Sequence, residues 1–451
     1  MKRQYTMIAA VGKTDPIRSE CDGPILHIIR HYHPHRIVLL FSAEFGKEEE
    51  KYGYMEQAIR LLDSKCEVHK IMTGIENPQS YDDLAESFVK VSVQVKEKYQ
   101  EDTILLNITS GTPQMESALC MIAFSDSERY LPVQVLTPQN GSNNKAFFNP
   151  ELDNISEWFE ADRDNMPGTR NRCIHPKLLI YKRPLIQHQI CSLIEDYDYK
   201  ASLQLYRENK EMFNREVGLL LEHATYRLNL EFDLAELTTK QLDCCGELYT
   251  ITEKRGKNLT EFYNSMRVKQ LRGELNDFVL RIEVFTEYLA IYLLEKCGIK
   301  LEDIANSKGR TNSIVYRLEK QKCEQAIPGI GKYLDGLYQN PFQWGNPVSA
   351  TAMVHIASFL TDQSMFKKYK LCVAEMQKWL KIIAGVRNPA AHTMIAIKED
   401  HIKKLYDNRS SSSLCEQMKA VLIKVSGGKI APKAFDTYSD INRRVKKALE
   451  K

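Results

Sequence analysis

The chain has 451 residues and a formal net charge of +3. This length exceeds a single typical core, so two or three domains are expected. The near-neutral charge argues against a nucleic-acid coat over the whole surface and leaves room for local basic grooves. Eleven cysteines without a Cys-x-x-Cys pair indicate reducing conditions, and no apolar run approaches membrane-spanning length. We therefore expect a cytoplasmic protein that makes no contact with a membrane.

Short apolar runs alternate with helical patterns over residues 1–160. The runs predict strands at Tyr5–Val11, Arg36–Ser42, Glu67–Thr73, Thr103–Ile108 and Leu131–Leu136. The segments between them predict helices around Ile25–Ile29, Glu48–Asp63, Asp82–Tyr99 and Met115–Phe124. This alternation predicts an α/β domain with a Rossmann-like, doubly wound parallel sheet.

Two polar loops follow the first and fourth predicted strands. With a strand order of 3-2-1-4-5 these strands are neighbours, and both loops line one crevice at the carboxyl edge of the sheet. Glycines there let backbone amides approach a ligand, hydroxyls and cations suit phosphates, and amides suit a base edge. The candidate ligand-binding residues are Gly12, Lys13, Asp15, Arg18, Asn107, Thr109, Ser110, Gly111 and Thr112, with Gln114 as a further base reader and Pro138-Gln139-Asn140 at the rim.

A simpler interpretation is that glycines and hydroxyl residues only make turns and cap helices. It accounts well for Thr112 and Pro113, as N-cap and first helical residue. Neither a Gly-x-Gly-x-x-Gly motif nor a Walker lysine is present, so a dinucleotide or nucleoside-triphosphate enzyme is disfavoured.

The rest of the chain is predicted to be helical. Residues 138–176 are rich in turn-forming and charged residues, and a helical linker domain is expected over 161–265. Over 266–451 an all-helical bundle is expected. Its helices are predicted at Leu275–Leu293 with Gly298 just past the end, Thr311–Gln325, Pro347–Leu360 and Tyr369–Ala384.

The segment Gly385–His392 carries the second candidate site. Gly385 is expected to stop a helix, and Asn388 and Pro389 to begin the next. Arg387 and His392 would then lie at a helix N-terminus, which favours an anion. A histidine there can take the proton of a ribose 2′-hydroxyl while an arginine stabilises the charge at phosphorus, as a ribonuclease requires.

The Arg-x4-His spacing by itself is weak. It also occurs at Arg30/His35, Arg170/His175 and Arg183/His188, which we interpret as surface or packing residues. Lys378 and Lys381 are interpreted as a solvated helix face rather than as guides for RNA, and the basic segment 443–447 either guides RNA or only keeps this end of the chain soluble. The histidines at 31, 33 and 35 lack further ligands at metal-binding spacing, so no metal site is expected.

Three segments carry a family resemblance. Asn-Ile-Thr-Ser-Gly-Thr-Pro-Gln-Met (107–115) resembles the signature loop of CARF domains, the ligand sensors of CRISPR-associated proteins, and the segment Gly12 to Arg18 resembles their first loop. Arg-Asn-Pro-Ala-Ala-His (387–392) is similar to the active-site motif of HEPN ribonucleases. In this order the segments resemble the type III CRISPR ancillary ribonucleases of the Csm-six/Csx-one kind.

The resemblance implies a function. Two CARF domains of a homodimer would bind cyclic oligoadenylate as activator, the hexa-adenylate being favoured over the tetra-adenylate. Two HEPN bundles would form a composite cleft in which Arg387, Asn388 and His392 cleave single-stranded RNA. The reaction would need no metal or cofactor and would leave 2′,3′-cyclic phosphate ends. Some members of the family also cleave their ligand slowly, a role to which Thr109 and Thr112 can contribute.

Two other functions stay open at the level of the sequence. One is a non-enzymatic cyclic-nucleotide sensor whose helical domain binds a protein or nucleic-acid partner. The other is a toxin-like ribonuclease controlled by an antitoxin, which the elaborate first domain disfavours.

Overall fold

The computed structural model divides the chain into two compact units, Met1–Pro184 and Leu185–Lys451. The structure describes residues 4–126, 128–138, 146–177, 179–242, 248, 251, 253–308, 315–337, 341–389 and 395–451. Each unit is considered by itself. Among the described residues, no helix is both long enough and apolar enough to cross a membrane.

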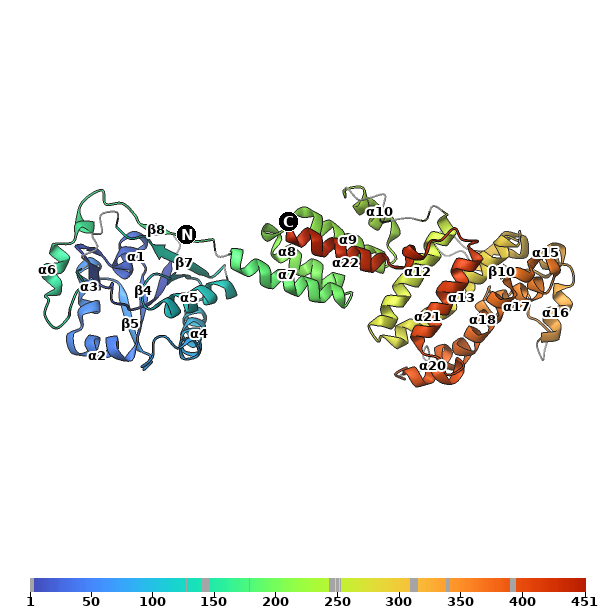
Figure 1. The fold of residues 1–451 in the computed structure, drawn as a ribbon, viewed down its shortest axis with the longest axis horizontal. Helices are drawn as coiled ribbons and strands as arrows, with labels where there is room; N and C mark the ends of the chain where they lie inside the picture. Colours follow the sequence, from blue (N-terminus) through green and yellow to red (C-terminus); the bar gives the residue numbers. More distant parts are fainter. Residues whose placement is uncertain are drawn as a thin grey trace. The chain divides into compact units, whose positions relative to one another are not determined.

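A six-stranded sheet forms the centre of the N-terminal unit (Figure 1). Its strands run in the order β5-β4-β1-β6-β7-β8, and all but β8 are parallel. Taken in chain order, the first five strands of this sheet (β1, β4, β5, β6 and β7) therefore have the expected spatial order 3-2-1-4-5. The strands are β1 Tyr5–Ala10, β4 Arg36–Phe41, β5 Glu67–Met72, β6 Thr103–Asn107, β7 Tyr130–Val135 and β8 Cys173–Ile174.

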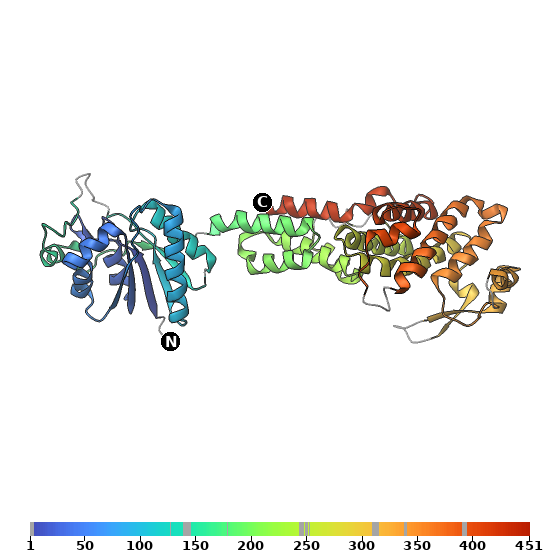
Figure 2. The same ribbon diagram turned by 90° about the horizontal axis from the view of Figure 1, so that it is seen from below.

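Helices cover both faces of this sheet, as a doubly wound fold requires (Figures 1 and 2). Successive side chains of β1 explain the two layers, because Met7 and Ala9 pack with α1 and α3 while Ile8 and Ala10 pack with α4 and α5. The helices of this unit are α1 Pro24–Tyr32, α2 Ala43–Tyr52, α3 Tyr54–Leu62, α4 Tyr81–Lys98, α5 Pro113–Ser125 and α6 Ile155–Glu160.

Two features of this unit differ from the prediction. The expected single helix over Glu48–Asp63 is two helices, because Gly53 takes a left-handed conformation between α2 and α3. Residues after β7 return to the same unit, where Ile155 of α6 enters the core and β8 pairs with β7. A short hairpin, β2 Ile17–Arg18 and β3 Cys21–Asp22, lies between β1 and α1.

The C-terminal unit is mainly helical. Its helices are α7 Leu179–Glu195, α8 Tyr199–Glu208, α9 Arg215–Leu228, α10 Phe232–Thr239, α12 Lys254–Leu271, α13 Leu275–Lys296, α14 Leu301–Ile304, α15 Lys320–Ala326, α16 Ile330–Leu337, α17 Ala350–Thr361, α18 Lys370–Ile382, α20 Glu399–Leu405, α21 Ser411–Val425 and α22 Thr437–Glu450. The expected long amphipathic helix is α13, with Gly298 at φ +85° after its end. The division of the chain into domains at 160 and 265 stays a prediction.

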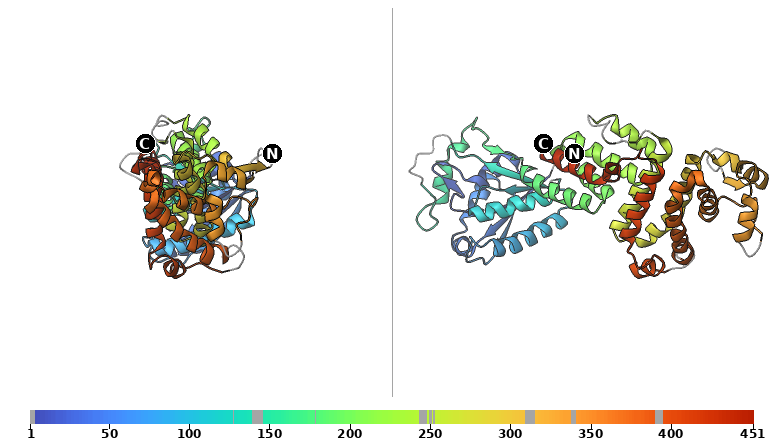
Figure 3. Two further views of the ribbon diagram at one scale, coloured as in Figure 1. Left: turned by 90° about the vertical axis from the view of Figure 1, so that its right-hand side faces the viewer. Right: turned by 45° about the vertical axis from the view of Figure 1, so that its right-hand side comes forward.

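Two hydrophobic cores organise this unit. The larger surrounds α13, which contributes buried residues from Phe278 to Leu294. In the smaller, α22 packs against α9 (Figure 3). Ile441 and Val445 of α22 belong to the same buried cluster as Val217 and Leu221 of α9. The end of the chain thus completes the apolar core of the helices that begin the unit.

The predicted helix over Thr311–Gln325 is wrong in its described part. Val315–Leu318 forms strand β10, which pairs antiparallel with β9, Ala305–Lys308, and only Lys320–Ala326 is helical. Val315 is exposed and Leu318 is buried, so this short stretch has strand rather than helix periodicity. The helical unit therefore contains a β-hairpin that the all-helical interpretation missed.

A buried ion pair connects α9 with α12. The guanidinium of Arg227 donates both Nε–H and Nη2–H to the carboxylate of Glu261, and each side chain is 2% exposed. Arg227 also donates to the carbonyl of Leu248, at 2.9 Å, and to the hydroxyl of Thr437, the first residue of α22, at 3.3 Å. One arginine therefore joins four segments of the helical unit.

Replacing Glu261 with Ala should destabilise the helical unit by about 3–5 kcal/mol, because it leaves the buried guanidinium without its countercharge. Urea unfolding monitored by circular dichroism measures the change. Glu222→Ala is the matched control, because the half-buried Glu222 of α9 pairs with the exposed Arg207 of α8, and losing this pair should cost less than about 1 kcal/mol. Equal losses in the two variants would contradict the role given to Arg227.

Candidate functional site

The loops after β1 and β6 lie side by side. These strands are parallel neighbours, with Ala9 opposite Asn107 at their carboxyl ends. The expected crevice between the first and fourth strands therefore has the strand arrangement that it needs.

The two loops touch through their glycines. A Cβ on Gly12 would lie 2.4 Å from the backbone nitrogen of Gly111, so only glycine allows this approach. Gly111 has φ +100°, a conformation that side chains disfavour. Both residues were expected to let a ligand approach the backbone, and in the structure their missing side chains let the two loops approach each other.

Three of the predicted polar residues form the internal frame of the loops. The carboxylate of Asp15 accepts hydrogen bonds from the backbone N–H groups of Gly12 (3.3 Å) and Ile25 (3.1 Å). Asn107 donates to the hydroxyl of Ser110 (2.8 Å) and accepts from the N–H of Thr109 (3.0 Å). Asp15, Asn107 and Ser110 are buried, so they hold the loops in shape rather than face solvent.

The two threonines anchor the β6 loop to its neighbours. The Thr109 hydroxyl accepts from the N–H of Val135 at the end of β7, at 2.8 Å. The Thr112 hydroxyl donates to the carbonyl of Pro78 (2.6 Å) and accepts from the N–H of Met115 (3.3 Å). Thr112 is thus the N-cap of α5, with Pro113 as its first residue, as predicted.

The two predicted cations, Lys13 and Arg18, lie close to the same aromatic ring, that of Phe147. The Lys13 ammonium lies 5.1 Å from the ring centroid of Phe147, and the Arg18 guanidinium lies 5.7 Å from it. Lys13 is exposed and Arg18 is half-buried. Both cations can therefore meet an anion at this edge of the sheet. Gln139 and Asn140 lie outside the described residues.

A cavity of about 650 Å³ opens beside these loops. It is lined by Thr14 and Arg18 from the β1 side, Thr109 from the β6 loop, and the segment Val135–Pro138 after β7. Its other wall carries Trp158, Arg163 and Arg172, together with Glu157 and Ala161. Sequence reasoning missed this wall, because residues 138–176 were taken for an interdomain boundary.

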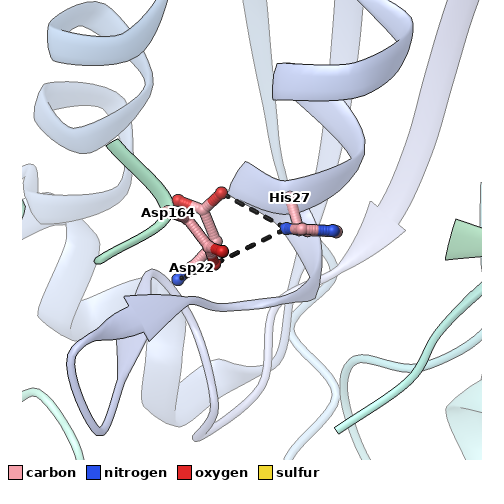
Figure 4. Close-up of side chains that lie close together, drawn as sticks. All are labelled: Asp22, His27 and Asp164. Carbon is pink, nitrogen blue, oxygen red and sulfur yellow. Dashed lines mark hydrogen bonds and ion pairs between the residues drawn. The ribbon is translucent and has the colours of Figure 1, made fainter. Parts of the chain in front are cut away.

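A network of buried charged side chains adjoins the cavity, since Asp22 and Arg172 are among the lining residues. Figure 4 shows three of its members, Asp22, His27 and Asp164. The Nδ1 atom of His27 lies 3.4 Å from the Asp22 carboxylate and 3.6 Å from that of Asp164. Arg30 donates to both oxygens of Asp22, at 2.7 and 2.9 Å, and Arg172 donates to Asp164 at 2.7 Å. Because these guanidinium groups neutralise the carboxylates, the cluster is a salt-bridge network rather than a set of metal ligands.

Arg172 connects the walls of the cavity with this charge network through its hydrogen bonds. Its backbone N–H donates to Nε2 of His27 at 3.0 Å, which leaves the ring proton on Nδ1, facing the carboxylates. Its guanidinium also donates to the carbonyls of Asp22 and Leu136, each at 3.1 Å. The hairpin, the end of β7 and the segment at 164–172 are thereby held together.

The second candidate site is built differently from the prediction. α18 does not stop at Gly385 but continues through η4, a π-helical turn over Ile383–Arg387, and Asn388 and Pro389 are also helical. Asn388 is therefore not an N-cap, and Arg387 does not begin a helix. Pro389 lacks an N–H and its ring would crowd the carbonyl of residue 385, which explains the widened turn. A Cβ on Gly385 would lie 2.5 Å from the Leu405 side chain, so close packing explains this glycine.

Arg387 is held by two oxygen atoms of this chain. Its Nη2 lies 2.8 Å from the carboxylate of Glu283 on α13, and its Nη1 donates to the side-chain oxygen of Asn388 at 3.1 Å. Burial, with the nearby charge of Glu283, raises the pKa of Glu287 on the next turn of α13 to about 7. His392 lies outside the described residues.

Two of the other Arg-x4-His pairs take part in packing. Arg30 belongs to the charge network, and His175 bonds with the hydroxyl of Tyr32 at 2.6 Å and the carbonyl of Pro132 at 3.0 Å. These contacts agree with their interpretation as structural residues.

Three family models match the chain in order. They are the Csm6 CARF domain at residues 67–173, the CRISPR-associated protein Csm6 6H domain at 176–228, and the Csm6 HEPN domain at 248–446. The chain belongs to the Csm6 family of CRISPR endoribonucleases. The expected combination of a CARF domain with a HEPN domain is therefore confirmed.

Two curated relatives and one solved structure, all Csm6 proteins, are also similar to this chain. A CRISPR system endoribonuclease Csm6 of Mycobacterium tuberculosis is 25% identical over 435 residues, which cover 96% of this chain and 97% of that protein. The Csm6 of Enterococcus italicus is 27% identical over 296 residues, 64% of this chain and 66% of that protein. The solved structure of Enterococcus italicus Csm6 bound to cyclic hexa-2′-fluoro-hexa-dAMP has the same fold, with a TM-score of 0.73, 20% identity, and coverage of 99% and 100% of the two chains.

The buried carboxyl of Asp15 should make the stability of the N-terminal unit depend on pH. Burial raises the pKa of Asp15 to about 7, against hydrogen bonds that lower it. In the unfolded chain this pKa is near 3.9, about its ordinary value. Between pH 4 and 7 the folded state thus holds a proton that the unfolded state has lost. The contribution of Asp15 to the unfolding free energy should therefore fall as pH rises, by at most about 1.4 kcal/mol per pH unit.

Asp15→Asn removes this titration, so its thermal unfolding midpoint should fall less than that of the native chain between pH 5 and 7. Differential scanning calorimetry at several pH values measures the slope. Asp82→Asn, at an exposed carboxyl in the first turn of α4, is the control and should keep the native slope. An unchanged slope in Asp15→Asn would contradict the buried, protonated state.

Proposed function

We propose that this chain is a metal-independent endoribonuclease that cyclic oligoadenylate activates. The observation that carries the proposal is the combination, in one chain, of a CARF-type loop pair beside a cavity with an Arg-Asn-Pro-Ala-Ala-His segment in a HEPN-type helical unit. The ligand-sensing domain alone does not explain the ribonuclease segment, and the ribonuclease segment alone does not explain the ligand-sensing domain. A sensor needs an output, and a ribonuclease without control would not need the first domain.

The ligand would bind at the carboxyl edge of the sheet. Lys13 and Arg18 lie close to the ring of Phe147 at this edge, where both can meet phosphates. Arg163 lines the cavity with its side chain 65% exposed and forms an ion pair with Glu20, so a phosphate would replace the Glu20 carboxylate as its partner. The cavity offers Trp158 and Val135–Pro138 as apolar surface for a base. The likeness to a relative solved with a cyclic hexa-adenylate analogue supports a hexa-adenylate ring over a tetra-adenylate ring.

In the helical unit His392 would act as the general base and Arg387 would stabilise the transition state. His392 takes the proton of the 2′-hydroxyl, whose oxygen attacks the adjacent phosphorus, and the 5′-oxygen leaves with a proton. Arg387 carries a permanent charge that matches the growing charge on the phosphate oxygens, and Asn388 orients Arg387 through their hydrogen bond. The products carry a 2′,3′-cyclic phosphate and a 5′-hydroxyl.

A homodimer would bring two such helical units together, so that each motif supplies half of one cleft. Binding of the ring across two N-terminal units and cleavage in the helical units would then be thermodynamically coupled. Cleavage of the ligand itself stays a prediction. The hydroxyls of Thr109 and Thr112, which were expected to contribute to it, are hydrogen-bonded within the protein.

His392→Ala and Arg387→Ala should each lower cleavage of a labelled single-stranded RNA by about 10²-fold or more, while ligand binding is kept. The assay is run in EDTA, without a ring and then with cyclic hexa- or tetra-adenylate. Lys381→Ala, an exposed position on α18, is the control and should cleave normally. Full activity in His392→Ala would contradict the assignment, and binding of the ring without any cleavage by the native chain would favour a non-enzymatic sensor.

Arg163→Ala should weaken binding of cyclic hexa-adenylate by about tenfold, the usual effect of losing one charged contact with a phosphate. Isothermal titration measures the affinity, and the salt dependence of binding should become shallower. Arg170→Ala provides the matched control, because Arg170 is exposed in the same segment but does not line the cavity. Equal effects of the two variants would place the ligand away from this cavity.

A further inference from the structure

Arg387 has a carboxylate partner on another helix. The π-helical turn η4 packs against α13, and the Arg387 guanidinium lies 2.8 Å from the Glu283 carboxylate. The side chains are 27% and 26% exposed, so neither moves freely in solvent. This pair joins residues that are far apart in the sequence, and it depends on the packing of the helical unit.

The guanidinium is held on more than one side. Nη2 meets Glu283 and Nη1 meets Asn388, while Nε is buried without a hydrogen-bond partner among the described residues. A planar guanidinium held at both terminal nitrogens keeps one orientation. Fixing a free arginine side chain costs about 2 kcal/mol of rotamer entropy. Because Glu283 and Asn388 already hold Arg387, RNA binding would not have to supply this free energy.

The neighbouring carboxyl strengthens the assignment to Glu283. Glu287 lies one turn further along α13, where burial and the charge of Glu283 oppose its ionisation. Among the described residues, the carboxylate that pairs with the Arg387 guanidinium is that of Glu283.

We propose that Glu283 is a positioning residue for the ribonuclease reaction, which holds the Arg387 guanidinium in the orientation that stabilises the charge at phosphorus. The inference rests on the proposed function, because it takes Arg387 as catalytic. Glu283 itself touches neither RNA nor the reacting atoms. Its effect should therefore appear in kcat and should disappear when Arg387 is absent.

The test is a double-mutant cycle with Glu283→Ala and Arg387→Ala in the ligand-activated full chain, with single-stranded RNA in EDTA. Glu283→Ala should lower kcat about tenfold or more and change KM less than twofold. In the Arg387→Ala background the same change should alter the residual rate less than twofold. Glu283→Gln, which keeps an oxygen acceptor without its charge, should be intermediate.

Glu295→Ala is the matched control. Glu295 also lies on α13 and pairs with an arginine, Arg255, at 2.7 Å and with similar exposure. It should change kcat less than twofold. Thermal unfolding and titration with cyclic hexa-adenylate check that each variant is folded and binds the activator.

Each other outcome has a definite meaning. A loss from Glu283→Ala that persists in full in the Arg387→Ala background would overturn the proposal, because the effect would then be structural. A gain in cleavage would also overturn it, since Glu283 would restrain Arg387 rather than position it. Normal cleavage by Arg387→Ala would refute the proposed function itself. If Arg387→Ala is inactive while Glu283→Ala cleaves normally, only the positioning role fails.

Discussion

The pairing of β1 with β6 is the constraint on which the N-terminal site depends. Because these strands are parallel neighbours, their carboxyl ends bring two loops together that are distant in the sequence. Gly12 and Gly111 then permit a backbone contact that no larger residue would allow. Asp15 accepts hydrogen bonds from Gly12 in its own loop and from Ile25 of α1, and Asn107 bonds with Ser110 within the β6 loop, so these buried side chains form a frame for the groups that remain accessible.

Charges at the two sites are arranged by the same physical rule. Arg172 pairs with Asp164 beside the cavity, and Arg387 pairs with Glu283 on the helical unit. Burying a charge is costly without such a partner. The partner also fixes the orientation of the guanidinium, which makes each pair a means of building a precise binding surface.

The π-helical turn shows how a local sequence can be misread when its tertiary neighbours are unknown. Glycine followed by Asn-Pro is typical of one helix that ends and another that begins, and this pattern predicted a break at Gly385. In the structure the helix continues through a turn that widens ahead of Pro389, and the Leu405 side chain occupies the space beside Gly385. The same residues therefore serve packing, and Arg387 gains a partner on α13 instead of a helix end.

The sequence by itself determined the strand and helix pattern of the first unit, the position of its two loops and the long helix α13. These features follow from local periodicity and from turn and cap chemistry, which neighbouring residues along the chain decide. Only the tertiary structure decided the cavity wall at Trp158–Arg172, the charge network around His27 and the pair of Arg387 with Glu283. These depend on segments that fold back from a distance, and the free energy of a buried charge depends on which partners that folding brings within reach.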